Sequence, residues 1–111
     1  MLAVAILAPA SPAFAHTKVV SSNPAANAVV AAPKQINITF NEQLVPAFSK
    51  VEVSMAGMDM KVPLKMSVSS DGKTLTGTPQ GRFTKGSYVI SWTAASADGH
   101  RTAGKIPFKI K

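Results

Sequence analysis

Apolar and polar residues alternate along much of the chain, and this pattern predicts extended strands with one buried face. Between residues 35 and 40, Ile36, Ile38 and Phe40 fall on one face and polar residues on the other. Pro107 has no amide proton to donate, so its strand is expected to lie at a sheet edge or to turn that nitrogen outward. In chain order, the predicted strands are Thr17–Ser21, Gln35–Phe40, Lys50–Met55, Val62–Val68, Lys73–Thr78, Ser87–Ala94 and Gly104–Lys111.

Turn-forming sequences separate the predicted strands, including Asn23-Pro24, Asp71-Gly72 and Asp98-Gly99. Apolar residues show no sustained helical spacing in any segment. About seven short strands with turns at intervals of roughly 8–12 residues are typical of an antiparallel β-sandwich. We therefore predict a single all-β domain.

Residues 1–15 carry no charge, are almost wholly apolar and end in Ala13-Phe14-Ala15. This pattern predicts a secretory signal peptide cleaved after Ala15, because the apolar run is too short to span a bilayer as a helix. A basic segment usually precedes such a run, so we expect the start of the leader to be truncated. The expected mature domain is exported, covers residues 16–111 and begins at His16.

Composition excludes several classes of protein. Hydrophobic residues make up 46% of the chain, which favours a globular domain over a disordered one. The chain has no cysteine, and this excludes disulfides, thiol catalysis, zinc–thiolate sites and iron–sulfur clusters. The formal charge is +7, but the basic residues are scattered singly without an aromatic ladder between them. We interpret the charge as a solvated basic surface and expect no nucleic-acid partner.

Both histidines stand where they could bind a metal ion. As an N-terminal residue, His16 would offer its α-amine and its ring Nδ1 to the same ion. In an extended segment Asp98 and His100 point the same way, and Gly99 between them permits an unusual backbone angle. This nitrogen- and oxygen-rich donor set suits copper(II). The alternative is that His16 follows the cleavage site by coincidence and that Asp98-Gly99 is an ordinary turn.

Every methionine apart from Met1 lies in one short stretch, at Met55, Met58, Met60 and Met66. Thioethers are soft ligands that favour copper(I) over hard cations. Met55 continues the inward face of its predicted strand, so for this residue core packing is the simpler interpretation. Met58 and Met60 lie where no apolar period calls for them. The alternative for the cluster is a gap-filling or adhesive methionine surface.

Motifs for enzymatic catalysis are scarce. The sequence contains no Gly-x-Ser-x-Gly motif, phosphate-binding loop or dinucleotide fingerprint. A Ser–His–Asp arrangement would have to reuse His16 or His100. Glu42 has two interpretations, an acceptor that orients a ligand histidine or an ordinary carboxylate at a strand end. We predict that the protein is not an enzyme.

Several short segments, taken in order, resemble the CopC/PcoC family of bacterial periplasmic copper-resistance proteins. Gly86-Ser-Tyr-Val-Ile-Ser-Trp92 is similar to the family's Gly-x-Tyr-x-Val-x-Trp pattern. Ala95-Ser-Ala-Asp-Gly-His100 is similar to its Ser-x-Asp-x-His signature. The resemblance covers nearly the whole expected mature chain, and it is also carried by residues 16–27, 32–42, 48–51 and 104–108.

The resemblance implies a seven-stranded antiparallel Greek-key β-sandwich or barrel of cupredoxin- or immunoglobulin-like type. It implies a copper(II) site made by the amine and ring of His16 with Asp98 and His100. It also implies a copper(I) site in the methionine-rich loop, to which the four clustered methionines correspond. Family members with a strong copper(I) site usually place a histidine in that loop, and this sequence has none there. We therefore expect an all-thioether site of lower affinity.

The function implied by the resemblance is that of a monomeric periplasmic copper carrier in copper resistance and homeostasis. Its implied partner is a CopD-type inner-membrane protein or another periplasmic copper protein. Two other interpretations stay open at this point. One is a copper-dependent oxidative enzyme of the type in which an N-terminal histidine braces the metal. The other is a metal-free basic module for adhesion or for binding a membrane surface.

Overall fold

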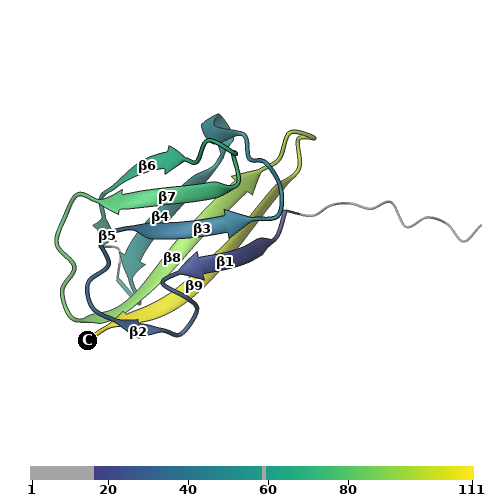
Figure 1. The fold of residues 1–111 in the computed structure, drawn as a ribbon. Helices are drawn as coiled ribbons and strands as arrows, with labels where there is room; N and C mark the ends of the chain where they lie inside the picture. The colour runs from purple at the N-terminus through teal and green to yellow at the C-terminus, as the bar shows by residue number, and fades with distance from the viewer. Residues whose placement is uncertain (1–16, 59) are drawn as a thin grey trace, which may run out of the picture.

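The computed structural model describes residues 17–58 and 60–111, which form two β-sheets packed face to face (Figure 1). The predicted signal peptide and His16 lie outside the described residues. The four-stranded sheet has the order β1 (Val19–Asn23), β3 (Ile36–Phe40), β7 (Thr74–Pro79) and β6 (Leu64–Val68). The five-stranded sheet has the order β2 (Val29–Val30), β9 (Arg101–Ile110), β8 (Gly86–Ala95), β4 (Lys50–Met55) and β5 (Lys61–Val62).

A short 3₁₀ helix, η1 (Pro46–Phe48), precedes β4. Within the described ranges, no helix is both long and apolar enough to cross a bilayer.

The inward faces of the two sheets form one hydrophobic core, as the alternation predicts. Ile36 and Ile38 of β3, in one sheet, and Val53 and Ile90, in the other, are all fully buried. Burial of such a side chain contributes roughly 1.5–3 kcal/mol to the free energy of folding. The core therefore holds the two sheets together without a disulfide.

The predicted all-β sandwich is confirmed, and each predicted strand is present. Pro63 divides the predicted strand Val62–Val68 into the end of β5 and β6, which belong to different sheets. The sequence pattern does not predict β2, because two residues are too few to show an alternation. β2 pairs with β9 in parallel, so the five-stranded sheet is mixed rather than wholly antiparallel.

Pro107 lies within β9 with its nitrogen turned away from β8. Its carbonyl accepts a hydrogen bond from the Asn27 N–H at 2.6 Å, on the side away from β8. The nitrogen and the carbonyl oxygen of one strand residue point to the same side, so the missing N–H belongs to this outer side. The prediction that Pro107 turns its nitrogen outward is confirmed.

β8 and β9 pair over ten residues and run along the length of the sandwich (Figure 1). Their connecting tip, residues 96–100, lies at one end. Met55 at the end of β4 pairs with Tyr88, near the start of β8. Tyr88 and Ala95 lie seven residues apart, and seven residues of strand span roughly 23 Å. The turn that follows Met55 therefore lies at the opposite end from the β8–β9 tip.

Gly104 of β9 leaves room for the Trp92 indole, which packs edge-on against Phe40 with ring centroids 5.1 Å apart. A Cβ atom at residue 104 would lie 2.5–2.9 Å from atoms of the indole ring. We predict that Gly104→Ala lowers the free energy of unfolding by about 1–3 kcal/mol, the usual effect of overpacking a core. Urea unfolding followed by the fluorescence of Trp92, the single tryptophan of the chain, measures this change.

The control is Ala103→Ser, which adds one atom at the exposed neighbouring position and should change stability by less than about 0.5 kcal/mol. Equal stabilities of the two variants would contradict the role assigned to Gly104.

Candidate metal centre

The β8–β9 tip is a tight turn closed by two backbone hydrogen bonds. The Gly99 N–H donates to the Ser96 carbonyl at 3.0 Å, and the Ser96 N–H donates to the His100 carbonyl at 3.0 Å. Gly99 has a φ of 89°, in a region that residues with a side chain rarely adopt. The turn leaves Asp98 and His100 about half exposed at the end of the sandwich.

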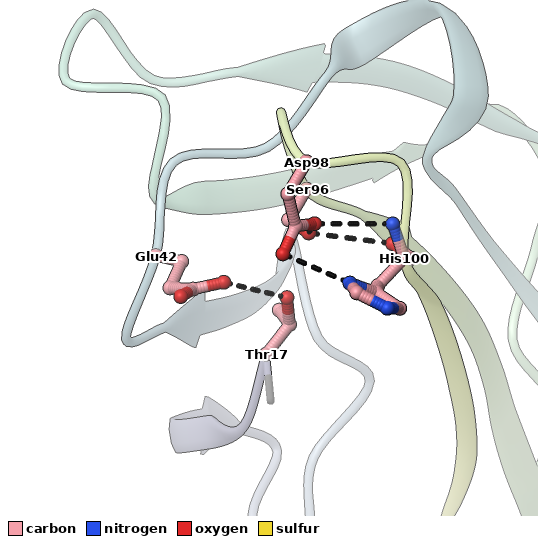
Figure 2. A network of polar contacts seen from close by, with 5 residues as sticks. All are labelled: Thr17, Glu42, Ser96, Asp98 and His100. Atoms are coloured by element: carbon pink, nitrogen blue, oxygen red, sulfur yellow. Dashed lines mark hydrogen bonds and ion pairs between the residues drawn. The ribbon is translucent and has the colours of Figure 1, made fainter. Parts of the chain in front are cut away.

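The Asp98 carboxylate gathers the polar groups of the turn (Figure 2). Its Oδ1 accepts hydrogen bonds from the Ser96 hydroxyl and, at 3.1 Å, from the His100 N–H. Its Oδ2 lies 2.9 Å from Nδ1 of the His100 ring. The structure thus brings together two of the three residues predicted to bind copper(II), and a hydrogen-bonded turn holds them.

These contacts determine the ionisation of the carboxylate and the orientation of the imidazole. The Ser96 hydroxyl, followed by the ring and the N–H of His100, holds the pKa of Asp98 well below its usual range. The carboxylate is therefore ionised at neutral pH. In a neutral His100, a proton on Nδ1 that faces Asp98 leaves the lone pair on Nε2, where a metal ion can bind.

The start of the described chain is fastened beside this turn. Thr17 is 5% exposed, and its hydroxyl donates to the Glu42 carboxylate at 3.1 Å. The Thr102 hydroxyl donates to the Thr17 carbonyl at 3.3 Å. Figure 2 shows Thr17 and Glu42 on the side of the turn toward which Asp98 and His100 point. His16, the third predicted ligand, precedes Thr17 and lies outside the described residues.

Sequence reasoning assigned no role to Ser96, Thr17 or Thr102. The serine two residues before Asp98 is the sequence signal for the hydroxyl–carboxylate contact, because serine and aspartate side chains commonly bond within turns. No local pattern announces the contact of Thr17 with Thr102, which joins residues 85 positions apart. Glu42, for which one interpretation is an acceptor that orients a ligand histidine, accepts a hydrogen bond from the Thr17 hydroxyl.

The four predicted copper(I) ligands divide into two groups. Met55 ends β4, and Met58 and Met60 follow in the β4–β5 turn, where the Met55 N–H donates to the Met60 carbonyl at 3.1 Å. Met55 packs against the core, as its strand position predicts, whereas Met58 and Met60 are 57% and 64% exposed. Met66 lies on β6, in the other sheet, and is 37% exposed.

The described residues contain no cluster of three or more histidine, cysteine, aspartate or glutamate side chains that could hold a metal. In this part of the chain, Asp98 supplies a carboxylate and His100 an imidazole, and the two side chains contact each other through Oδ2 and Nδ1. Such donors suit a borderline divalent ion, whereas the thioethers of the β4–β5 turn suit a soft monovalent one.

The lowered pKa of Asp98 predicts a specific effect of acid on the metal-free protein. As the pH falls below about 4, the unfolded chain takes up a proton at Asp98 while the folded carboxylate stays ionised. Stability is therefore lost as the pH falls. Asp98→Asn should make the decline of the unfolding free energy between about pH 4 and pH 2 shallower. The slope should fall by an amount that corresponds to the uptake of at most one proton on unfolding. Urea titrations at a series of pH values measure this slope, and parallel curves would contradict the assignment.

Comparison with known proteins identifies relatives of this chain. A family model described as the CopC domain matches residues 19–111. Copper resistance protein C of Xanthomonas campestris pv. juglandis is 43% identical over 117 residues, an alignment that covers all of this chain and 91% of that protein. Copper resistance protein C of Pseudomonas syringae pv. tomato is 40% identical over 89% of this chain and 83% of its own length.

The fold also agrees with a solved structure of a relative. The crystal structure of PcoC, a methionine-rich copper resistance protein from Escherichia coli, superposes with a TM-score of 0.78 at 34% identity. The match covers 86% of this chain and 99% of PcoC. The expected family fold, a cupredoxin-like β-sandwich, is thereby confirmed. On the matched domain, the identities and the fold, the chain belongs to the CopC family of copper-binding copper-resistance proteins.

Proposed function

We propose that this protein is a periplasmic copper carrier that binds copper(II) through the amine and ring of His16 together with Asp98 and His100. The observation that carries the proposal is the pairing of Asp98 with His100 beside the fastened Thr17. Consecutive Cα atoms are about 3.8 Å apart, so a chain that starts at His16 begins one residue from this anchor. Cleavage after Ala15 would then create the amine donor at the site that uses it.

The donor chemistry supports copper(II) as the cargo of this end. One ionised carboxylate, imidazole nitrogens and an amine suit a tetragonal ion, and copper(II) binds such donors most tightly among the divalent first-row metals. The hydrogen bonds from Ser96 and from the His100 N–H hold the carboxylate in place without a metal. The Oδ2–Nδ1 contact would have to open for Asp98 and His100 to bind one ion, while the backbone of the turn is already ordered.

We further propose that the thioethers at the opposite end bind copper(I). Met58 and Met60 are exposed on one turn, and Met55 lies next to them with its N–H bonded to the Met60 carbonyl. Met66, the fourth predicted ligand, lies on β6 of the other sheet. Nitrogen and oxygen donors at one end and thioethers at the other would let one carrier bind copper in either oxidation state. The carrier would then pass the copper ion to a CopD-type inner-membrane protein.

A carrier explains the described surface better than an oxidative enzyme does. Enzymes that cleave polysaccharides bind them on flat faces, often with exposed aromatic rings. In the described part of the chain, Phe48 is the large aromatic side chain that is mostly exposed, and the Arg101 guanidinium lies 5.3 Å from its ring centre. Asp98 beside His100 would also occupy a position that oxygen needs. Oxygen-dependent cleavage of chitin or cellulose by the copper-loaded protein would overturn this choice.

Copper(II) binding is tested on protein recovered after export, with its first residue established by mass spectrometry as His16. We expect His100→Ala and Asp98→Ala each to weaken copper(II) binding on the order of tenfold or more and to change the electron paramagnetic resonance spectrum. Loss of His16, by His16→Ala, removes the ring donor and should have the same effect.

The matched control is Asp71→Ala. Asp71 occupies the same kind of turn, with hydrogen bonds from the Ser69 hydroxyl and from the Lys73 N–H at 3.0 Å, but without a histidine. This variant should bind copper(II) like the unmodified protein. Equal affinity and spectra for Asp98→Ala and Asp71→Ala would refute the site.

Copper(I) binding is tested by competition with a chromogenic copper(I) chelator under reducing conditions. The double substitution Met58→Leu with Met60→Leu keeps the apolar volume but removes two thioethers, and we expect it to weaken copper(I) binding on the order of tenfold or more. The copper(II) spectrum should not change, because that site lies at the other end of the sandwich. Unaltered copper(I) affinity would place the soft site elsewhere.

A further inference from the structure

The outer face of the five-stranded sheet is strongly basic. Along β9 the buried Ile106, Phe108 and Ile110 alternate with exposed residues, which include Lys105 and Lys109. The outward positions of the sheet also carry further cations and one carboxylate: Arg101 of β9, Lys50 of β4, Lys61 of β5 and Glu52 of β4.

The charges of this face are unevenly neutralised. Glu52 lies 3.1 Å from the Lys61 ammonium and 3.5 Å from that of Lys50, at the β4–β5 side of the sheet. Lys105 and Lys109 make no ion pair with any part of the chain that the structure describes. The β9 side of the face therefore presents two ammonium groups to a partner.

The outer face of the central strands of the other sheet, β3 and β7, differs from this basic face. These strands expose neutral side chains that bond to each other: Thr39 with Thr74 at 3.0 Å, and Thr76 with Asn37 at 2.8 Å. The central strands of that sheet thus carry no charged side chain on their outer face, although Lys65 of β6 is exposed at its edge.

A groove crosses the basic face between β2 and the β4–β5 turn. It consists of two hollows of about 280 and 340 Å³ that share Ala56 and Val89 as lining residues. Lys109 and Pro107 line the first hollow, and Lys105 lines the second. No acidic residue lines either hollow among the described residues.

The groove has an apolar floor between two cations. Val89 of β8 pairs with Pro107 of β9, while the flanking residues Ser91 and Ser87 pair with Lys105 and Lys109. Lys105 and Lys109 are four residues apart, which is roughly 13 Å along the strand. Along β9, the groove therefore presents one ammonium group, an apolar floor and a second ammonium group, at the spacing of residues in a strand.

We propose that this groove docks an acidic, extended segment of a partner protein, with two carboxylates four residues apart and an apolar residue midway. In an extended segment, alternate residues share one face, so the carboxylates would meet Lys105 and Lys109 while the apolar side chain enters the hollow at Val89 and Pro107. Charge complementarity sets the register and the burial of the apolar residue adds affinity.

The concave shape favours a protein segment over a lipid surface. A bilayer is contacted by side chains that protrude, whereas hollows of this size are filled by the side chains of a bound chain. Met58 lines the second hollow, so a docked segment would lie beside a proposed copper(I) ligand. In this respect the inference rests on the proposed carrier function, although docking itself needs no copper.

The test uses the exported, metal-free protein labelled with ¹⁵N and a synthetic heptapeptide, Ser-Glu-Ser-Leu-Ser-Glu-Ser, with blocked ends. We expect the peptide to shift the amide signals of Ser54, Val89, Ser91, Lys105 and Lys109 and to leave those of Asn37 and Thr76 on the other sheet in place. The control peptide Ser-Glu-Glu-Leu-Ser-Ser-Ser has the same composition without the spacing and should bind several-fold more weakly.

Matched variants separate the groove from net charge. Lys105→Glu with Lys109→Glu should weaken peptide binding on the order of tenfold or more, whereas Lys34→Glu with Lys65→Glu changes the net charge equally at exposed positions outside the groove and should have less than a twofold effect. Ala56→Trp should block the groove without altering its charge.

Four outcomes of these tests would overturn the proposal. The first is equal binding of the two peptides, and the second is equal weakening of peptide binding by the two double charge reversals. The third is that the peptide shifts amide signals outside the groove instead of those within it. The fourth is binding to vesicles of anionic phosphatidylglycerol that depends on Lys105 and Lys109, with no binding of the peptide, which would assign the face to a membrane. Copper(II) titration of the same variants keeps the two proposals apart, because the groove substitutions should leave copper(II) affinity unchanged.

Discussion

Pairing between β8 and β9 is the constraint on which the other features of this domain depend. The ten paired residues place Tyr88, Ile90 and Phe108 in the core, where they are at most 1% exposed. The same alternation faces Lys105 and Lys109 outward, because neighbouring strand residues point to opposite sides. Where the ladder ends, the chain must reverse, and this reversal holds Asp98 next to His100.

The polar groups at that reversal combine local order with exposure. Asp98 is held by three donors, yet its side chain is 52% exposed and its charge remains solvated. A buried carboxylate would carry a large desolvation penalty, and water and an incoming ion could not reach it easily. An exposed turn that is already ordered suits the proposed carrier, because an ion could enter and leave without unfolding of the domain.

The two ends and the two faces of the sandwich differ in chemistry. Oxygen and nitrogen donors lie at the β8–β9 tip, and the exposed thioethers of Met58 and Met60 lie about the length of β8 away. The groove between Lys105 and Lys109 lies on the outer face of the sheet that bears both turns. A partner seated there would therefore reach the soft end while the hard end stays open to solvent.

The sequence by itself determined most of the strands, the inward faces of those strands and the Asp98–His100 pair, because these depend on alternation and on neighbours two positions apart. It also indicated the outward nitrogen of Pro107, a property of one residue. Tertiary structure alone decided that Thr17 meets Glu42 and Thr102, that Met66 lies on the other sheet from the β4–β5 turn, and that β2 pairs with β9. These contacts join residues far apart in the chain, and no local periodicity encodes which strands become neighbours.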